Sequence, residues 1–260
     1  MSESSVYRWH AGDLHLLDYC DMTDTAIVVA DSWLVTDGTA LALDLHRQRF
    51  FRAANGLIDD LDRFWSTSIA AIPRTGDWFP RVELQLRGGA LLAVFRLRSA
   101  PELSRSVRLA SHLGADPRTT PCIKGPDTAA LLRIRTEAQS HGAGEAVILS
   151  PDGFVVEGAY SAIFWWRGEV LCAPSPELDR VESVTARSVI ALATARRVET
   201  YTESIVPAEL DGCEIWAVSS LHGIRIVTAW LSGPSPAELP GRLSTWRSRL
   251  DRLRQPLPLP

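Results

Sequence analysis

The longest uninterrupted apolar run in this chain is only six residues, 90–95, and the glycine pair Gly88-Gly89 precedes it. A helix that spans a bilayer needs about 20 apolar residues, so this chain is not expected to cross a membrane. Short runs bounded by turn residues are typical of strands joined by hairpins. With 260 residues, 46% of them hydrophobic, the chain can bury a real core, which excludes intrinsic disorder.

Charge and cysteine usage exclude further classes. The formal net charge of −4 and the lack of a basic cluster speak against a nucleic-acid partner. The first 13 residues include charged side chains and no signal-peptide-like apolar stretch, so a cytoplasmic protein is expected. The cysteines contain no CxxC pair, which argues against a metal site or a disulfide framework; they are Cys20, Cys122, Cys172 and Cys213.

Turn signals and apolar periodicity predict an α+β chain. Asp37-Gly38 and Gly88-Gly89 each separate two apolar runs, so each is expected to form a hairpin turn. The polar stretch around Pro117 predicts a linker at 114–122 between an N-terminal domain, 1–113, and a C-terminal domain, 123–260. Helices are expected at 45–57, 60–71, 127–141, 185–196 and 240–254.

Lysine usage is the most unusual count, because Lys124 is the single lysine among 27 basic residues. Arginine supplies a permanent charge, whereas only lysine supplies a primary amine that can lose its proton and attack a carbonyl. Lys124 stands just before a predicted helix and not on its solvated face. Both a reactive amine and a surface residue that survived by chance remain open at this point.

Glu157 is the second candidate, because it ends a strand whose preceding residues, 154–156, are all apolar. Burying a carboxylate is costly unless it is paired. The position therefore indicates either a paired, functional carboxylate or a hairpin end that faces water.

A series of motifs surrounds these two residues in a fixed order. They are Ile123-Lys124, Glu145–Leu149, Pro151-Asp152-Gly153, residues 156–164, residues 183–187 and Val218-Ser219-Ser220, with Leu45-His46 and Arg49-Phe50 in the first half. In order and spacing they resemble the fold-type IV pyridoxal-phosphate enzymes, which include branched-chain and D-amino-acid aminotransferases and aminodeoxychorismate lyase. The resemblance covers most of the chain from Lys124 to Trp230. It implies a two-domain α+β fold with pyridoxal 5'-phosphate between the domains.

The resemblance also implies roles for individual residues. Lys124 would hold the cofactor aldehyde as an aldimine and shuttle a proton at the substrate α-carbon. Glu157 would keep the pyridine nitrogen protonated, so that the ring can accept electrons. The phosphate would be bound by Arg49, by the backbone N–H groups of Val184 and Thr185 at a helix N-terminus, and by the Ser220 hydroxyl.

Substrate contacts are less well defined, because the chain departs from the family pattern where the pocket is formed. Residues 29–35 replace a glycine-rich motif that lines the pocket, and Ser32 is a candidate contact there. Ala162, which stands where the family usually carries an asparagine, is another. Arg98 fits the position of an arginine that meets the substrate carboxylate, and a solvated strand face is its alternative. Ala129 stands where branched-chain aminotransferases carry a tyrosine.

The leading prediction is an aminotransferase that moves an amino group between an amino acid and a 2-oxo acid. A lyase that eliminates pyruvate to form p-aminobenzoate is the alternative, and an inactive homologue is a third. The resemblance also predicts a homodimer. The aromatic content of the first half favours an interface there and is carried by Phe50, Phe51, Trp65 and Trp78.

Overall fold

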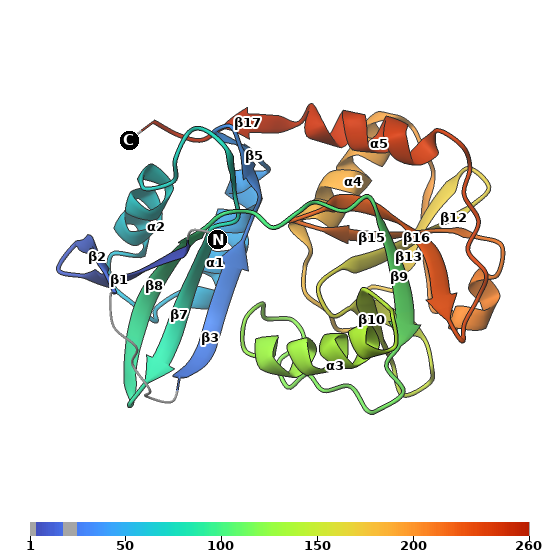
Figure 1. Cartoon of the computed structure of the whole chain (residues 1–260), viewed down its shortest axis with the longest axis horizontal. Coiled ribbons are helices and arrows are strands. Elements are labelled where there is room, and N and C mark those ends of the chain that lie inside the picture. Colours follow the sequence, from blue (N-terminus) through green and yellow to red (C-terminus); the bar gives the residue numbers. More distant parts are fainter. Residues whose placement is uncertain (1–3, 18–24, 260) are drawn as a thin grey trace. The chain divides into compact units, whose positions relative to one another are not determined.

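The computed structural model describes residues 4–17 and 25–259, so Cys20 lies outside the described residues. The chain divides into two compact units (Figure 1). Unit 1 comprises Met1–Leu103, Ile123–Pro126 and Leu253–Pro260, and unit 2 comprises Ser104–Cys122 and Asp127–Arg252. Each unit has its own main sheet and its own apolar core.

Unit 1 is built on an antiparallel sheet in the order β2-β1-β8-β7-β3. Helices α1 (Leu43–Ala54) and α2 (Leu61–Ala70) cover one face of it, where Phe50 and Phe64 pack with Val82 and Phe95. The strands are β1 (Ser4–His10), β2 (Asp13–Leu16), β3 (Thr25–Ser32), β7 (Arg81–Arg87) and β8 (Ala90–Arg98). A smaller sheet contains β4 (Val35–Thr36), β5 (Thr39–Leu41), β6 (Asp77–Trp78) and β17 (Arg254–Pro256).

Both hairpins that the turn residues predict are confirmed. Asp37 and Gly38 join β4 to β5 with φ angles of 45° and 70°, and Gly88 and Gly89 join β7 to β8 with φ angles of 54° and 82°. Positive φ at both central residues suits a two-residue hairpin, because it matches the twist of the flanking strands.

Unit 2 contains an eight-stranded mixed sheet in the order β11-β10-β9-β16-β15-β12-β13-β14. Its core includes Leu109, Trp165 and Ile215. The strands are β9 (Ser106–Ser111), β10 (Glu145–Leu149), β11 (Val155–Gly158), β12 (Ala162–Arg167), β13 (Val170–Pro174), β14 (Thr200–Glu203), β15 (Glu214–Ser219) and β16 (Gly223–Leu231). The helices are α3 (Thr128–Ser140), α4 (Val184–Ala195), α5 (Arg242–Asp251) and the 3-10 helix η1 (Pro207–Leu210).

The boundaries of the two units differ from the expected domain boundaries, because some strands pair with partners far away in the sequence. Strand β9 lies before the expected boundary, but it pairs with β10 and β16 and so belongs to unit 2. Strand β17 returns to unit 1 by pairing with β5, so α5 ends at Asp251 and not at the expected residue 254. The predicted linker, 114–122, contains no helix or strand.

The aromatic residues of the first half do not form the exposed patch that the sequence suggested. Phe50 and Trp65 are buried, while Phe51 and Trp78 pack partly buried against the same core. That interpretation was wrong, because α1 and α2 turn Phe50, Phe51 and Trp65 toward the core, and Trp78 packs against the same core from β6. They therefore carry no argument for a subunit interface. Among residues 4–17 and 25–259, no helix is long and apolar enough to cross a membrane.

Candidate active site

Lys124 was expected in the C-terminal domain, but it lies in the segment Ile123–Pro126, which belongs to unit 1 because its backbone is bonded to β3. The N–H of Ala30 donates to the Lys124 carbonyl over 2.7 Å. Gly125 follows with φ +133°, and a Cβ there would lie 2.7 Å from the Ala30 nitrogen. Only glycine allows this approach. The Lys-Gly pair of the sequence therefore has a local cause in the close packing of this segment on β3.

Arg49 and His46 lie one turn apart on α1 and meet the carboxylate of Asp31 on β3. Arg49 Nε donates to Asp31 Oδ2 over 2.8 Å, and Arg49 Nη2 donates to Oδ1 over 2.7 Å. His46 Nδ1 lies 2.8 Å from the same Oδ1, and the Ser32 N–H donates to it over 2.7 Å. Asp31 is fully buried, so the predicted phosphate ligand is held by an internal ion pair.

The charges in this cluster follow from burial and pairing. Burial by itself raises the pKa of a carboxyl, but Arg49 and His46 hold the pKa of Asp31 well below its usual range. Burial lowers the pKa of His46 against the opposing effect of Asp31, which favours the neutral imidazole. Neutral His46 then donates from Nδ1, because an ionised carboxylate only accepts. Asp31 was not identified as a site residue from the sequence.

Arg98 and Ser32 lie on the face of the unit 1 sheet opposite its helices. Arg98 Nε donates to the Phe79 carbonyl over 2.8 Å, and its guanidinium lies 4.8 Å from the centre of the Phe79 ring. Burial, Arg81 and Arg96 lower the pKa of Arg98, so the position is not a simple solvated face. Ser32 is buried, and its hydroxyl has no hydrogen-bond partner among the residues that the structure describes.

Glu157 is at the end of β11 in unit 2, where it is buried and ion-paired with Arg118. Arg118 also pairs with Asp116 at 2.7 Å. Burial opposes the charge of Arg118, but Asp116 and Glu157 raise its pKa. Sequence reasoning missed Arg118, because it lies in a segment expected to be a linker. The only signal for Arg118 in the sequence was an acidic and a basic residue on either side of Pro117, and such a pair is too common to indicate a site.

The N-terminus of α4 carries the remaining phosphate candidates. The Ser183 hydroxyl caps the helix by accepting from the Ala186 N–H over 3.2 Å, which explains a serine where the family pattern has glycine. Val184 and Thr185 are the first helical residues, and both are buried. The Thr185 and Ser220 hydroxyl oxygens lie 3.5 Å apart, so the fold brings together two candidates from distant segments.

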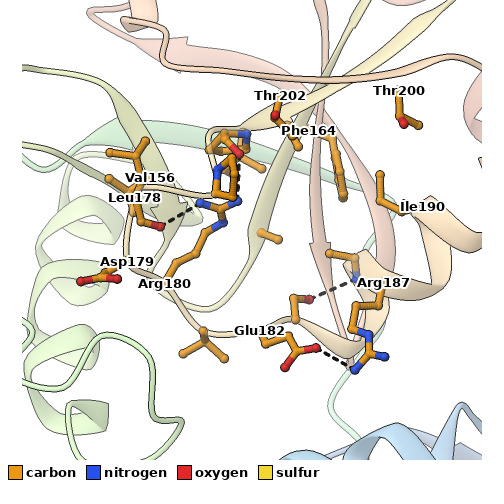
Figure 2. A pocket seen from close by; sticks show the side chains of 18 of the residues that line it. Val156, Phe164, Leu178, Asp179, Arg180, Glu182, Arg187, Ile190, Thr200 and Thr202 are labelled. Atoms are coloured by element: carbon orange, nitrogen blue, oxygen red, sulfur yellow. Dashed lines mark hydrogen bonds and ion pairs between the residues drawn. The ribbon is translucent and has the colours of Figure 1, made fainter.

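A cavity of about 780 Å³ lies in unit 2 beside this helix start (Figure 2). Arg180 braces the loop that leads to α4, since Nη1 donates to the carbonyls of Ser175 and Leu178 and Nη2 donates to that of Pro174. The apolar part of the wall includes Val156, Phe164, Leu178 and Ile190. Ala162 and Ser183 also line it, so one proposed substrate contact borders this space.

Glu145 is a second carboxylate near Glu157 that the sequence did not single out for chemistry. It is fully buried, and it accepts from the Ser161 hydroxyl over 3.0 Å and from the Tyr160 N–H over 3.3 Å. A Cβ on Gly158 would lie 3.0 Å from Glu145 Cγ, so glycine leaves room for this side chain. Glu145 thus holds the turn that follows Glu157.

Comparison with solved structures shows which fold this is. The chain is similar to a branched-chain aminotransferase from Thermoproteus uzoniensis, with 19% identity, a TM-score of 0.80, and coverage of 98% of this chain and 100% of that one. It is also similar to a fold IV transaminase from Curtobacterium pusillum, with 19% identity, a TM-score of 0.76, and coverage of 95% and 97%. A putative 4-amino-4-deoxychorismate lyase from Legionella pneumophila gives 16% identity, a TM-score of 0.75, and coverage of 89% and 92%.

These structural matches define the fold as that of the fold-type IV enzymes. Residues 28–230 match the amino-transferase class IV family, and the chain belongs to that family. Its members are enzymes that depend on pyridoxal phosphate, as the motifs implied. Comparison with curated proteins finds no match.

The side chains present have the chemistry that this cofactor requires. Unit 1 contains the single primary amine of a lysine and the guanidinium of Arg49. Unit 2 contains a helix N-terminus with two adjacent hydroxyls, which suits a phosphate, and the buried carboxylate of Glu157, which suits a protonated ring nitrogen. Lysine, arginine, hydroxyl and carboxylate groups therefore match the aldehyde, the phosphate and the pyridine ring in kind.

Proposed function

We propose that this protein is an aminotransferase that moves an amino group between an amino acid and a 2-oxo acid. The observation that supports it most directly is the meeting of the Thr185 and Ser220 hydroxyls, 3.5 Å apart, at the start of α4, where a helix N-terminus favours the cofactor phosphate. When bound, the cofactor supplies a ring that accepts the electrons released at the substrate α-carbon.

In this proposal two residues carry the chemistry. The Lys124 amine holds the cofactor and then takes and returns the proton of the substrate α-carbon. The Glu157 carboxylate accepts a hydrogen bond from the pyridine nitrogen and keeps that nitrogen protonated. Burial of Glu157 strengthens this interaction, because water competes less for the carboxylate.

The phosphate and the substrate are held by other groups. Arg49, the N–H groups of Val184 and Thr185, and the Ser220 hydroxyl bind the phosphate, to which the dipole of α4 adds a favourable field. Arg98, Ser32 and Ala162 are proposed to contact the substrate. The Ser32 hydroxyl supports this role, since a buried hydroxyl that has no partner within the described part of the chain can donate to a ligand.

Reduction with borohydride tests the assignment of Lys124. The protein with bound cofactor is expected to be yellow and to lose that colour on reduction. Because the chain has a single lysine, peptide mapping should locate the reduced adduct at Lys124 alone. Label confined to the N-terminal amine, or no uptake of cofactor, contradicts the proposal.

A lyase that eliminates pyruvate to form p-aminobenzoate is the second candidate function. It is favoured by exposed Ala129 on α3, where the branched-chain aminotransferases carry a tyrosine. Incubation with amino donors separates the two: an aminotransferase converts bound cofactor to its amine form, whereas a lyase releases pyruvate from aminodeoxychorismate and regenerates the aldehyde. An inactive homologue does neither.

We also propose a homodimer, as in the enzymes that the chain resembles. Light scattering at dilute concentration tests it, with a mass twice that of the 28.6 kDa chain as the expected result. A fully active monomer contradicts it.

A further inference from the structure

The Asp31 carboxylate is a buried junction that no role in the proposed chemistry accounts for. It sits at the end of β3 and receives both Nε and Nη2 of Arg49, together with Nδ1 of His46. Such a two-pronged contact fixes the plane of a guanidinium as well as its position. Arg49 and His46 are three residues apart on α1, so they share one face of that helix.

An arginine without such a partner binds an anion more weakly, because its side chain must give up conformational freedom when the anion binds. A free arginine side chain carries about 2 kcal/mol of rotamer entropy, part of which is lost when it binds. Asp31 orders Arg49 before any anion arrives. His46 Nδ1 contacts the same Asp31 oxygen as Arg49 Nη2, and the centre of its ring lies 5.8 Å from that of Trp33, which limits its movement.

The same end of strand β3 also contacts the backbone of Lys124. Ala30, the residue before Asp31, holds the Lys124 carbonyl through its N–H. Adjacent residues of one strand therefore position the two groups of unit 1 that the proposed function needs. The backbone of Ala30 serves the lysine, and the side chain of Asp31 serves the arginine.

We propose that Asp31 is a positioning residue that pre-orders Arg49 for the phosphate of the cofactor. The proposal rests on the proposed function, in which Arg49 binds that phosphate. It predicts that loss of Asp31 weakens binding of a phosphorylated ligand specifically. A ligand without the phosphate is not expected to be affected, because Asp31 acts through Arg49 and not through Lys124.

The test compares pyridoxal phosphate with pyridoxal, which lacks the phosphate. Both are titrated into the full-length protein after removal of cofactor, with dissociation constants read from absorbance. Asp31→Asn keeps the size of the side chain but removes its charge. We expect it to weaken pyridoxal phosphate about tenfold or more while pyridoxal changes less than about twofold. Equal weakening of both ligands, or of neither, overturns the proposal.

Glu83→Gln is the matched control in the same sheet. Glu83 is also buried and pairs with two arginines, Arg81 and Arg96, but it does not contact Arg49. This variant is expected to keep the wild-type preference for pyridoxal phosphate over pyridoxal. If it loses that preference as Asp31→Asn does, the effect is a general loss of sheet stability and the proposal fails.

Arg49→Gln separates this proposal from the function on which it rests. If Arg49→Gln leaves pyridoxal phosphate binding unchanged, Arg49 does not hold the phosphate and both fail. If Arg49→Gln weakens it but Asp31→Asn does not, only the positioning role fails. If Asp31→Asn alone does not fold, a double variant that combines Asp31→Asn with Arg49→Gln takes its place. The double variant removes both charges of the ion pair, so it leaves neither of them unpaired. It should match Arg49→Gln alone, and any further loss of preference shows that Asp31 acts by another route.

Discussion

The two units each contain a fully buried carboxylate, Asp31 in unit 1 and Glu145 in unit 2, and the two carry opposite pKa shifts. The pKa of Asp31 lies well below its usual range despite its burial. Burial raises the pKa of Glu145, and its partners do not reverse the effect. Equal burial therefore does not imply equal charge.

The difference lies in the donors. Asp31 receives two hydrogen bonds from the Arg49 guanidinium, one on each oxygen. Glu145 receives neutral hydrogen bonds, and its ion pair with Arg225 is longer, at 3.6 Å. Charge-assisted hydrogen bonds are about twice as strong as neutral ones and oppose the cost of desolvation. Burial thus raises the free-energy cost of ionising a carboxyl, and the hydrogen-bond and ion-pair partners determine whether the carboxyl ionises.

The largest effect expected from this comparison is on stability. Asp31→Asn should lower the free energy of unfolding by about 3 kcal/mol, because it leaves the part-buried guanidinium of Arg49 without its countercharge. Glu145→Gln, its counterpart in unit 2, should cost less, since the ion pair of Glu145 with Arg225 is longer, at 3.6 Å, and its other donors are neutral. Urea unfolding of both variants measures this. Equal losses would break the distinction between the two carboxylates.

Catalysis should separate Glu145 from Glu157, which is also buried but is ion-paired with Arg118. Glu157→Gln should reduce turnover about a hundredfold or more while cofactor is retained, as expected when electrostatic stabilisation is removed. Glu145→Gln should change turnover far less, although Glu145 contacts the turn that directly follows Glu157. Near-normal turnover of Glu157→Gln would mean that another group protonates the ring.

The pH dependence of stability should have opposite signs for the two carboxyls. Glu145 has a folded pKa above its unfolded value, so stability falls as pH rises between them, by up to about 1.4 kcal/mol per pH unit. Asp31 has a folded pKa below its unfolded value, so its contribution is complete above the unfolded value of about 3.9 and is lost as pH falls further.

Unfolding measured from pH 3 to pH 8 checks these signs. The stability of Glu145→Gln should decline less than that of the wild type as pH rises above about 4.3. The loss of unfolding free energy in Asp31→Asn, relative to the wild type, should become smaller below about pH 4. A Glu145→Gln variant that keeps the wild-type slope would show that this carboxyl is ionised after all.

The smallest effect belongs to a neutral hydrogen bond at a partly exposed site. Ser183→Ala removes the cap of α4, which should cost about 1 kcal/mol of unfolding free energy. Thermal melting of this variant beside Ser183→Asn, which can still cap, measures it. If Ser183→Asn is as unstable as Ser183→Ala, the loss does not come from the cap.

Much of the architecture could be read from local signals. The Asp37-Gly38 and Gly88-Gly89 turns, the helices of both halves and the start of α4 depend on residues close in sequence. Sequence reasoning failed where distant strands decide, as for β9 and β17, because pairing partners leave no local pattern. It also took Phe50 and Trp65 for exposed surface, because it could not see which face of each helix meets the sheet.

By itself the sequence determined the family and the chemical groups available: one lysine amine, a helix start suited to an anion, and a carboxylate after an apolar strand. Only the tertiary structure decided their partners. Asp31 and Arg49 are 18 residues apart, and Arg118 and Glu157 are 39 apart. The charge of a buried group depends on whatever the fold brings within hydrogen-bond distance, and that is a property of three-dimensional packing that no short stretch of sequence contains.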